Sequence, residues 1–193
     1  MIGTTGLPAI AVVATGLSLF AVATAMGRGG RSTEAGATRD RASLFGIGVQ
    51  GAGFAIAATS PVRVVLDPLG VAALGKAALA GAFMGAALAL FMWARRTLGR
   101  NWSIVARTRA DHALVTAGPF AHVRHPIYSA LALLLIVVAV GLGHELRLIA
   151  ALPVYALGTW LRVRVEERLL ARRFGDAYAA YAARVKRVVP FVL

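Results

Sequence analysis

Long apolar runs constrain the fold of this chain more than any other feature. Hydrophobic residues make up 59% of its 193 residues and charged residues only 15%, against roughly 45–50% and 25% in soluble domains. A water-soluble fold of this size could not bury so much apolar surface, so the sequence predicts a fold in a lipid bilayer. A helical span needs about 20 mostly apolar residues. Five runs come near that length, covering residues 7–26, 42–60, 69–93, 127–142 and 146–163.

These runs predict an all-α polytopic membrane protein with about five transmembrane helices, built as one domain over residues 1–193. The first run lacks the basic flank and the cleavage site of a signal peptide, so we expect it to be a span. The composition is rich in Ala and Arg, which is typical of bacteria with GC-rich genomes. We therefore expect the bacterial inner membrane as the location.

The basic residues lie unevenly on the two sides of the predicted bundle. The chain has 21 Lys and Arg against 8 Asp and Glu, a net charge of +13. Five spans place all of these basic residues on one side except Arg63, Lys76 and Arg147. Because basic loops stay in the cytoplasm, we expect an outside N-terminus and a cytoplasmic C-terminus. We attribute the charge to topology and anionic headgroups and expect no nucleic-acid partner, since the sequence has no helix-turn-helix or aromatic-basic pattern.

Several kinds of chemistry are excluded or disfavoured by the residues present. The chain has no cysteine, which excludes disulfides, thiolate nucleophiles and cysteine metal sites. His112, His122 and His125 match no familiar metal-binding spacing. The sequence also has no nucleophile elbow and no glycine-rich phosphate loop. No metal site is predicted.

The last part of the chain has the pattern of an amphipathic helix. Between residues 166 and 189 the apolar and aromatic side chains recur at steps of three and four, the period of one helix face. They are Leu170, Phe174, Tyr178, Tyr181 and Val185. Arginines fill much of the opposite face, as in helices that lie on a membrane surface. We expect a cytoplasmic helical cap that Gly175 breaks or bends.

Polar groups cluster in two segments, residues 111–128 and 162–167, at the cytoplasmic ends of the last two predicted spans. Each piece has an ordinary explanation. Arg124 and His125 could anchor a helix end at the headgroups, Pro126 could start a helix, and an Arg162–Glu166 pair could be a helical ion pair. The adjacent carboxylates of Glu166 and Glu167 repel each other and suggest a cationic partner, which neighbouring arginines could also provide.

Taken as one ordered pattern, the two segments resemble the isoprenylcysteine carboxyl methyltransferase family and, more broadly, its phospholipid-methyltransferase relatives. The resemblance covers about the last half of the chain. The matching residues are His112, Leu114, Val115, Gly118, Phe120, Arg124, His125, Pro126, Tyr128, Glu166, Glu167, Leu170, Phe174, Gly175, Tyr178, Tyr181, Pro190 and Phe191. Two positions depart from the family: Phe120 replaces the usual tyrosine, and Ala130 stands where glycine is common.

The resemblance implies that S-adenosylmethionine binds on the cytoplasmic side between residues 94–126 and 162–193. Glu166 would hold the charged methionine portion of this cofactor. Arg162 would bind the acceptor, and Arg162, Glu167 and Arg124 are the candidate catalytic residues. The expected lining of the cofactor pocket is His112, Ala113, Leu114, Val115, Phe120, His125, Pro126, Ile127, Tyr128 and Glu166.

The expected acceptor is a lipophilic molecule, and carboxyl O-methylation of an isoprenylcysteine-like substrate is what the resemblance favours. A carboxylate is already ionised, so its methylation needs no general base. Alternatives are N-methylation of a phospholipid amine or another small hydrophobic molecule, for which His125 or Glu167 could take a proton, and a non-catalytic lipid-binding protein. A sterol-type reductase is disfavoured by the short chain. The sequence leaves the oligomeric state open.

Overall fold

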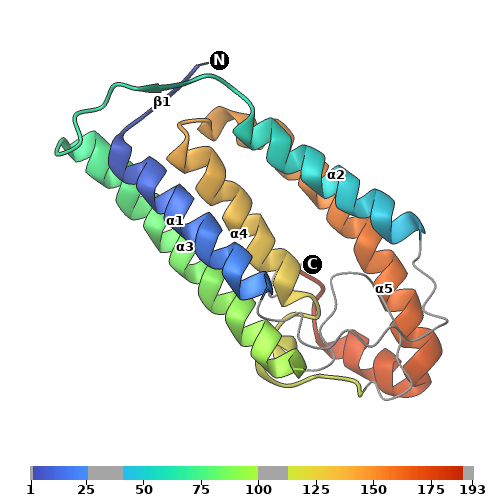
Figure 1. Ribbon diagram of the computed structural model, residues 1–193. Helices are drawn as coiled ribbons and strands as arrows, with labels where there is room; N and C mark the ends of the chain where they lie inside the picture. Colours follow the sequence, from blue (N-terminus) through green and yellow to red (C-terminus); the bar gives the residue numbers. More distant parts are fainter. Residues whose placement is uncertain (1, 26–40, 100–112, 189–193) are drawn as a thin grey trace.

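The structure is a computed structural model that describes residues 2–25, 41–99 and 113–188. Five helices form an elongated bundle (Figure 1). Their bounds are α1 Leu7–Ala25, α2 Arg41–Ala58, α3 Val71–Leu98, α4 Pro126–Gly141 and α5 Leu148–Arg184. The predominantly helical fold is as predicted, and each helix begins within two residues of a predicted apolar run.

The helices pack mainly in pairs. α1 lies along α3, α3 along α4, and α2 along α5 (Figure 1). α4 also touches α1, α2 and α5, so it joins the two outer pairs of the bundle. One apolar cluster, with Phe20, Met84, Phe91 and Leu134, fills the space between α1, α3 and α4. A second cluster, which includes Tyr155, joins α2, α4 and α5.

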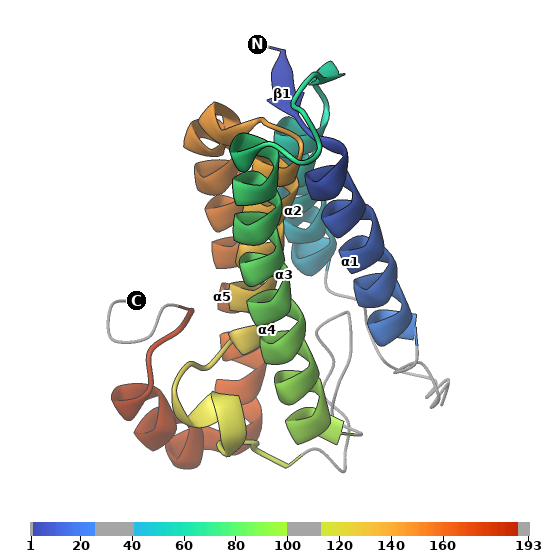
Figure 2. The ribbon, with the colours of Figure 1, turned by 90° about the vertical axis from the view of Figure 1, so that its left-hand side faces the viewer.

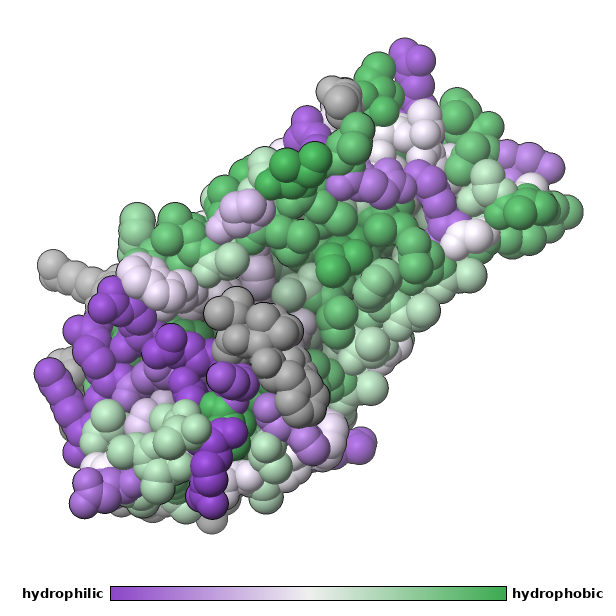
Figure 3. Space-filling view, turned by 180° about the vertical axis from the view of Figure 1, so that it is seen from behind, coloured by the Kyte–Doolittle hydropathy of each residue, from purple (hydrophilic) through white to green (hydrophobic). Residues whose placement is uncertain are grey.

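Among the described residues, three helices are long and apolar enough to cross a membrane: α1, α3, and the helix that runs from Glu145 to Arg184 and contains α5. The apolar part of α2, Ser43–Ala58, and α4 are shorter. Large apolar side chains such as Phe45 and Ile149 point outward, with 66% and 77% of their surface exposed. Figure 3 shows hydrophobic residues over the length of the bundle and hydrophilic residues gathered at the end that carries the last part of α5.

The fifth predicted span continues without a break into the first part of the predicted cap, as far as Gly175, and a second helical segment follows this residue. The sequence analysis ended the span at residue 163, but α5 continues to Arg184. Gly175 interrupts it with a backbone φ of +49°, a conformation that glycine adopts without steric cost. The chain turns there and leads back towards α4 (Figure 2). The predicted break at Gly175 is confirmed. α3 also runs five residues past its predicted end at residue 93.

The other end of the bundle carries a small sheet that the sequence analysis did not predict. β1 (Gly3–Thr5) pairs in parallel with β2 (Val62–Val64). Three-residue strands are too short to show the period of two by which strands are recognised. The Thr5 hydroxyl donates to the Gly141 carbonyl at 2.7 Å, and Lys76 pairs with Glu145 at 2.6 Å. These contacts tie the ends of α1, α3 and α4 together.

Candidate functional site

The two polar segments singled out in the sequence lie side by side. One is the start of α4 with the residues that precede it, and the other is the middle of α5. Local structure positions both: Pro126 is the first residue of α4, where its missing N–H costs no hydrogen bond, and residues four apart on α5 share one face. The side chains that meet are Arg124, His125, Tyr128, Arg162, Glu166 and Glu167.

His125 lies between the two adjacent glutamates of α5. Its Nδ1 is 3.5 Å from a carboxylate oxygen of Glu166, and its Nε2 is 3.4 Å from one of Glu167. Only 7% of His125 is exposed. Tyr128, one turn along α4, donates its hydroxyl to Glu166. The two carboxylates therefore tolerate each other's charge because each has its own partners.

Both His125 and Glu167 lie outside the predicted spans, and their pKa values are shifted. Burial lowers the pKa of His125, but hydrogen bonds to Glu166 and Glu167 and their negative charges outweigh it, so its pKa lies above 6.5. Burial raises the pKa of Glu167, but hydrogen bonds from His125 and Arg124 outweigh it and lower the pKa to about 2. The arrangement thus favours a protonated His125 between two ionised carboxylates.

Arg124 joins the start of α4 to the end of the cap. Its Nε and Nη2 contact Glu167 at 3.0 and 2.8 Å. Its Nη1 donates to the carbonyls of Ala182 and Val185 at 2.6 and 2.5 Å. The backbone N–H of Arg124 donates to the Lys186 carbonyl at 2.7 Å. The guanidinium of Arg124 is thus bound by other residues of the protein. The catalytic role predicted for Arg124 stays a prediction.

Arg162 is a buried cation of the cluster, with 8% of its surface exposed. Its guanidinium lies over the Tyr128 ring, 5.1 Å from the centroid, at a distance typical of a cation–π contact. Nη2 is 3.7 Å from Glu166, and Nη1 donates to the side-chain amide oxygen, Oε1, of Gln50 at 3.2 Å. Arg162 thus shares Glu166 and Tyr128 with the group around His125.

The segment before α4 is held by tyrosines of α5. Residues 113–117 lead into a short 3₁₀ helix, Gly118–Ala121. Phe120 is buried, and its carbonyl accepts a 2.7 Å hydrogen bond from Tyr181. Tyr155 donates in the same way to the Tyr128 carbonyl at 2.7 Å. The sequence matched Tyr181 to the family pattern but assigned neither tyrosine this role, because nothing local in a sequence marks a side chain that caps a distant carbonyl.

The remaining residues of the predicted cofactor pocket lie before α4 or at its start, or outside the described residues. Ala113 is exposed, whereas Leu114 and Val115 are half-buried in the segment before the 3₁₀ helix. Pro126 is fully buried, and Ile127 packs against the apolar cluster of α3 and α4. His112, Pro190 and Phe191 lie outside the described residues. Gln50 and Thr159 were missed, although a glutamine inside an apolar run is itself a signal of a functional position.

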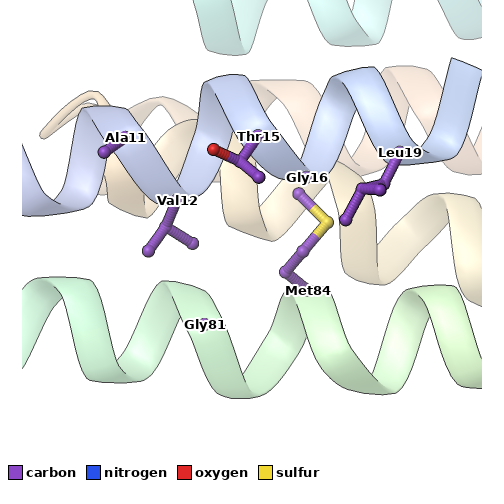
Figure 4. Close-up of a pocket in the computed structure, with 7 residues that line it drawn as sticks. All are labelled: Ala11, Val12, Thr15, Gly16, Leu19, Gly81 and Met84. Carbon is purple, nitrogen blue, oxygen red and sulfur yellow. The ribbon is translucent and has the colours of Figure 1, made fainter.

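The flank of the bundle has a pocket that is formed by helices other than α4 and α5. It opens between α1 and α3 (Figure 4) and is lined by small and apolar side chains: Ala11, Val12, Thr15, Gly16, Leu19, Gly81 and Met84. This lining has no charged group, so it offers no counter-charge to a cationic ligand. Within the described residues no cluster of His, Asp and Glu side chains is arranged to hold a metal ion.

Sequence comparisons with known proteins match about half of the chain. Residues 79–172 match the model of the isoprenylcysteine carboxyl methyltransferase (ICMT) family. A protein-S-isoprenylcysteine O-methyltransferase of Tribolium castaneum is 32% identical over 109 residues, which cover 50% of this chain and 35% of that protein. Protein-S-isoprenylcysteine O-methyltransferase B of Arabidopsis thaliana is 34% identical over 102 residues, which cover 50% of this chain and 50% of that protein. A cobalt-zinc-cadmium resistance protein, CzcN, of Cupriavidus metallidurans is 34% identical over 99 residues, 49% of this chain and 44% of that one.

The fold is shared over a longer stretch than the sequence. A solved structure of the eukaryotic intramembrane Ras methyltransferase ICMT superposes with a TM-score of 0.58 at 21% identity, covering 96% of this chain and 68% of that one. The chain spans about a third to a half of the length of the curated relatives it matches. The matched segment and these relatives confirm the predicted resemblance of this chain to the isoprenylcysteine carboxyl methyltransferase family, and the solved structure shows that the fold is shared.

Proposed function

We propose that this protein is an S-adenosylmethionine-dependent methyltransferase that esterifies the carboxylate of a lipophilic, isoprenylcysteine-like acceptor at the cytoplasmic face of the membrane. One observation carries the proposal: Arg162, a buried cation, shares both the Glu166 carboxylate and the Tyr128 ring with the group around His125. An anion-binding group and a cation-binding group are thus adjacent, as transfer from a cationic cofactor to an anionic acceptor requires.

The residues present fit the cofactor's charges. When bound, S-adenosylmethionine supplies an electrophilic methyl group on a sulfonium, and it also carries an ammonium. The side chain of Glu166 is 23% exposed, and its carboxylate supplies the negative charge that a cationic ligand needs. The Tyr128 ring can attract a cation at its face. We assign Glu166 to the methionine portion and Tyr128, Phe120 and residues 113–115 to the walls of the pocket.

Arg162 fits the acceptor. A guanidinium binds a carboxylate through two parallel hydrogen bonds and fixes its orientation. The apolar length of α5 before this residue would keep the acceptor's hydrocarbon tail in lipid while its carboxylate reaches Arg162. The carboxylate is the nucleophile, so the protein's contribution is to align the reactants and exclude water. Glu167, which His125, Arg124 and Arg187 all contact, would keep the cap closed over α4.

The proposal includes the predicted topology. α2 and α4 lie beside the three long apolar helices, so we propose five spans, with an outside N-terminus and a cytoplasmic C-terminus in the bacterial inner membrane. The cytoplasmic cap is then the part of α5 beyond residue 163 together with residues 185–188. It carries most of the exposed arginines of α5, which suits anionic headgroups.

Methylation of a lipid amine is the second candidate. It requires a neutral His125, which could then accept the proton that an amine loses, whereas the contacts of this ring with both glutamates favour its protonated form. An amine acceptor would offer Arg162 no anionic group to orient, so the geometry favours the carboxyl reaction.

Cofactor binding to detergent-solubilised protein tests the proposal. We expect saturable binding of labelled S-adenosylmethionine to the wild type and its loss in Glu166→Gln, which removes the charge that holds the ammonium. Glu145→Gln is the matched control, because Glu145 lies at the opposite end of the bundle in an ion pair with Lys76. Absence of binding to the wild type contradicts the proposed activity. Equal binding by the wild type and Glu166→Gln contradicts only the assignment of Glu166.

A further inference from the structure

Gln50 is a buried polar residue in the middle of an apolar helix. Only 5% of it is exposed, and its contacts with Thr159 and Arg162 place it on the side of α2 that packs against α5. The buried positions of α2 recur at steps of three and four, the spacing of a helix–helix seam. They are Ser43, Gly46, Gln50, Gly53 and Ala57. Gln50 is thus the one long side chain in a seam of small residues.

Glycines bring the backbones of α2 and α5 close together at this seam, as small residues do between helices in membranes. A Cβ built on Gly158 would lie 2.6 Å from the backbone nitrogen of Gln50. A Cβ on Gly46 would lie 2.6 Å from Cγ of Arg162. The absence of a side chain at Gly46 therefore leaves space for the aliphatic part of the Arg162 side chain. The side chain of Gln50 must pack along α5.

The amide of Gln50 connects two residues of α5. Its Nε2 donates to the Thr159 hydroxyl at 2.8 Å, and its Oε1 accepts from Nη1 of Arg162 at 3.2 Å. A guanidinium has only donors, so the amide oxygen must face Arg162 and the amide nitrogen must face Thr159. The guanidinium therefore sets the orientation of the amide, and Thr159 anchors the amide so that it holds one edge of the guanidinium.

We propose that Gln50 is a positioning residue that holds Arg162 in place for the acceptor carboxylate without adding a second negative charge to that of Glu166. An amide supplies a hydrogen bond without a counter-charge, whereas a glutamate at this position would pair with Arg162 and occupy it. This inference rests on the proposed function and deepens it. Gln50 lies outside residues 79–172, the segment that matches the family model.

The test compares binding of a farnesylated cysteine with a free carboxylate and binding of its methyl ester to the solubilised protein. The wild type is expected to prefer the acid. Gln50→Glu should reduce the affinity for the acid by about tenfold or more, since a charge-assisted contact is lost, and leave that for the ester unchanged. Gln50→Leu and the near-isosteric Thr159→Val should weaken the preference less, because Arg162 keeps its charge but loses its anchor.

Ser43→Ala is the matched control, because Ser43 lies on the same seam of α2 and is fully buried. It should keep the preference for the acid. S-adenosylmethionine affinity, measured on each variant, should stay at the wild-type level, which a general loss of structure would not allow. Absence of cofactor binding to the wild type would contradict the proposed function, and the acid preference is read independently of it.

Three results would overturn the inference. The first is a wild type that binds acid and ester equally. The second is an unchanged preference for the acid in all three Gln50 and Thr159 variants. The third is a parallel loss of cofactor, acid and ester binding in these variants, which would assign Gln50 to helix packing alone.

Discussion

At the scale of single residues, His125 is where the two polar segments meet. The two ring nitrogens face different glutamates at 3.5 and 3.4 Å, and the backbone N–H donates to the Arg187 carbonyl at 2.8 Å. The ring therefore links α4 to α5, and the backbone of His125 links α4 to the end of the cap. Because the raised pKa of His125 reflects these contacts, the folded state prefers the protonated ring.

The pH dependence of stability should follow from this preference. A group whose pKa is raised by folding contributes its full stabilisation below the unfolded pKa, near 6.5, and loses it as pH rises through the folded value. The melting temperature in detergent should therefore fall as pH increases above 6.5. Glu167, with a pKa of about 2, stays ionised over this range and adds nothing to the change.

His125→Asn should flatten this pH profile, because the side chain no longer titrates. His122→Asn is the control, since His122 is exposed and contacts neither Glu166 nor Glu167 in the described structure. A His125→Asn profile with the wild-type slope would show that the histidine does not carry the effect.

At the scale of elements, the contact between α2 and α5 sets the position of Arg162. The backbones approach at Gly46, Gly53 and Gly158, where an added Cβ would lie 2.6 to 3.0 Å from the nearest atom of the facing helix. Gly48, on the exposed side of the same α2, has nothing within 4 Å. Within this helix pair, some glycines thus allow close contact between the backbones, whereas Gly48 faces open space.

Alanine substitutions should distinguish these two kinds of glycine position. Gly158→Ala places a methyl group against the α2 backbone and should destabilise the protein by about 1–3 kcal/mol, the usual cost of overpacking. Gly48→Ala meets open space and should stabilise α2 by roughly 0.5–1 kcal/mol. Unfolding in detergent measures both changes. Equal effects of the two substitutions would contradict the close contact between α2 and α5.

The sequence predicted these elements unevenly. Hydropathy located all five helices, and Gly175 was recognised as a break because only its type permits the backbone conformation there. The continuity of α5 was missed because the change from apolar to arginine-rich composition is a change of surroundings and leaves the helix intact. The motif identified Glu166 and Glu167, but Gln50 lies 112 residues from Arg162, and no local pattern links them.

At the scale of the whole molecule, charge and hydropathy divide the bundle along its length. Apolar surface covers the helices, and hydrophilic residues gather at the end with the cap (Figure 3). The opposite end holds the β1–β2 sheet and the Lys76–Glu145 pair. If the predicted topology holds, the candidate site and the sheet lie on opposite sides of the membrane.

Introduced cysteines can test this topology without background, because the chain has none. Leu69 is 83% exposed in the turn before α3, and Asp176 is exposed in the cap. A membrane-impermeant maleimide should label Leu69→Cys in intact cells, and Asp176→Cys only after permeabilisation. The reverse pattern, or equal labelling of both in intact cells, would contradict the orientation.

The central claim is methyl transfer to a lipophilic carboxylate, and the chemical nature of the product tests it most directly. Membranes containing the protein are supplied with methyl-labelled S-adenosylmethionine and either a farnesylated cysteine or phosphatidylethanolamine. We predict a labelled product on the farnesylated acid that releases methanol in alkali, as an ester does, and its loss in Glu166→Gln and Arg162→Met but not in Glu145→Gln. A product found only on the amine and stable to alkali, or no labelled product at all, would contradict the account.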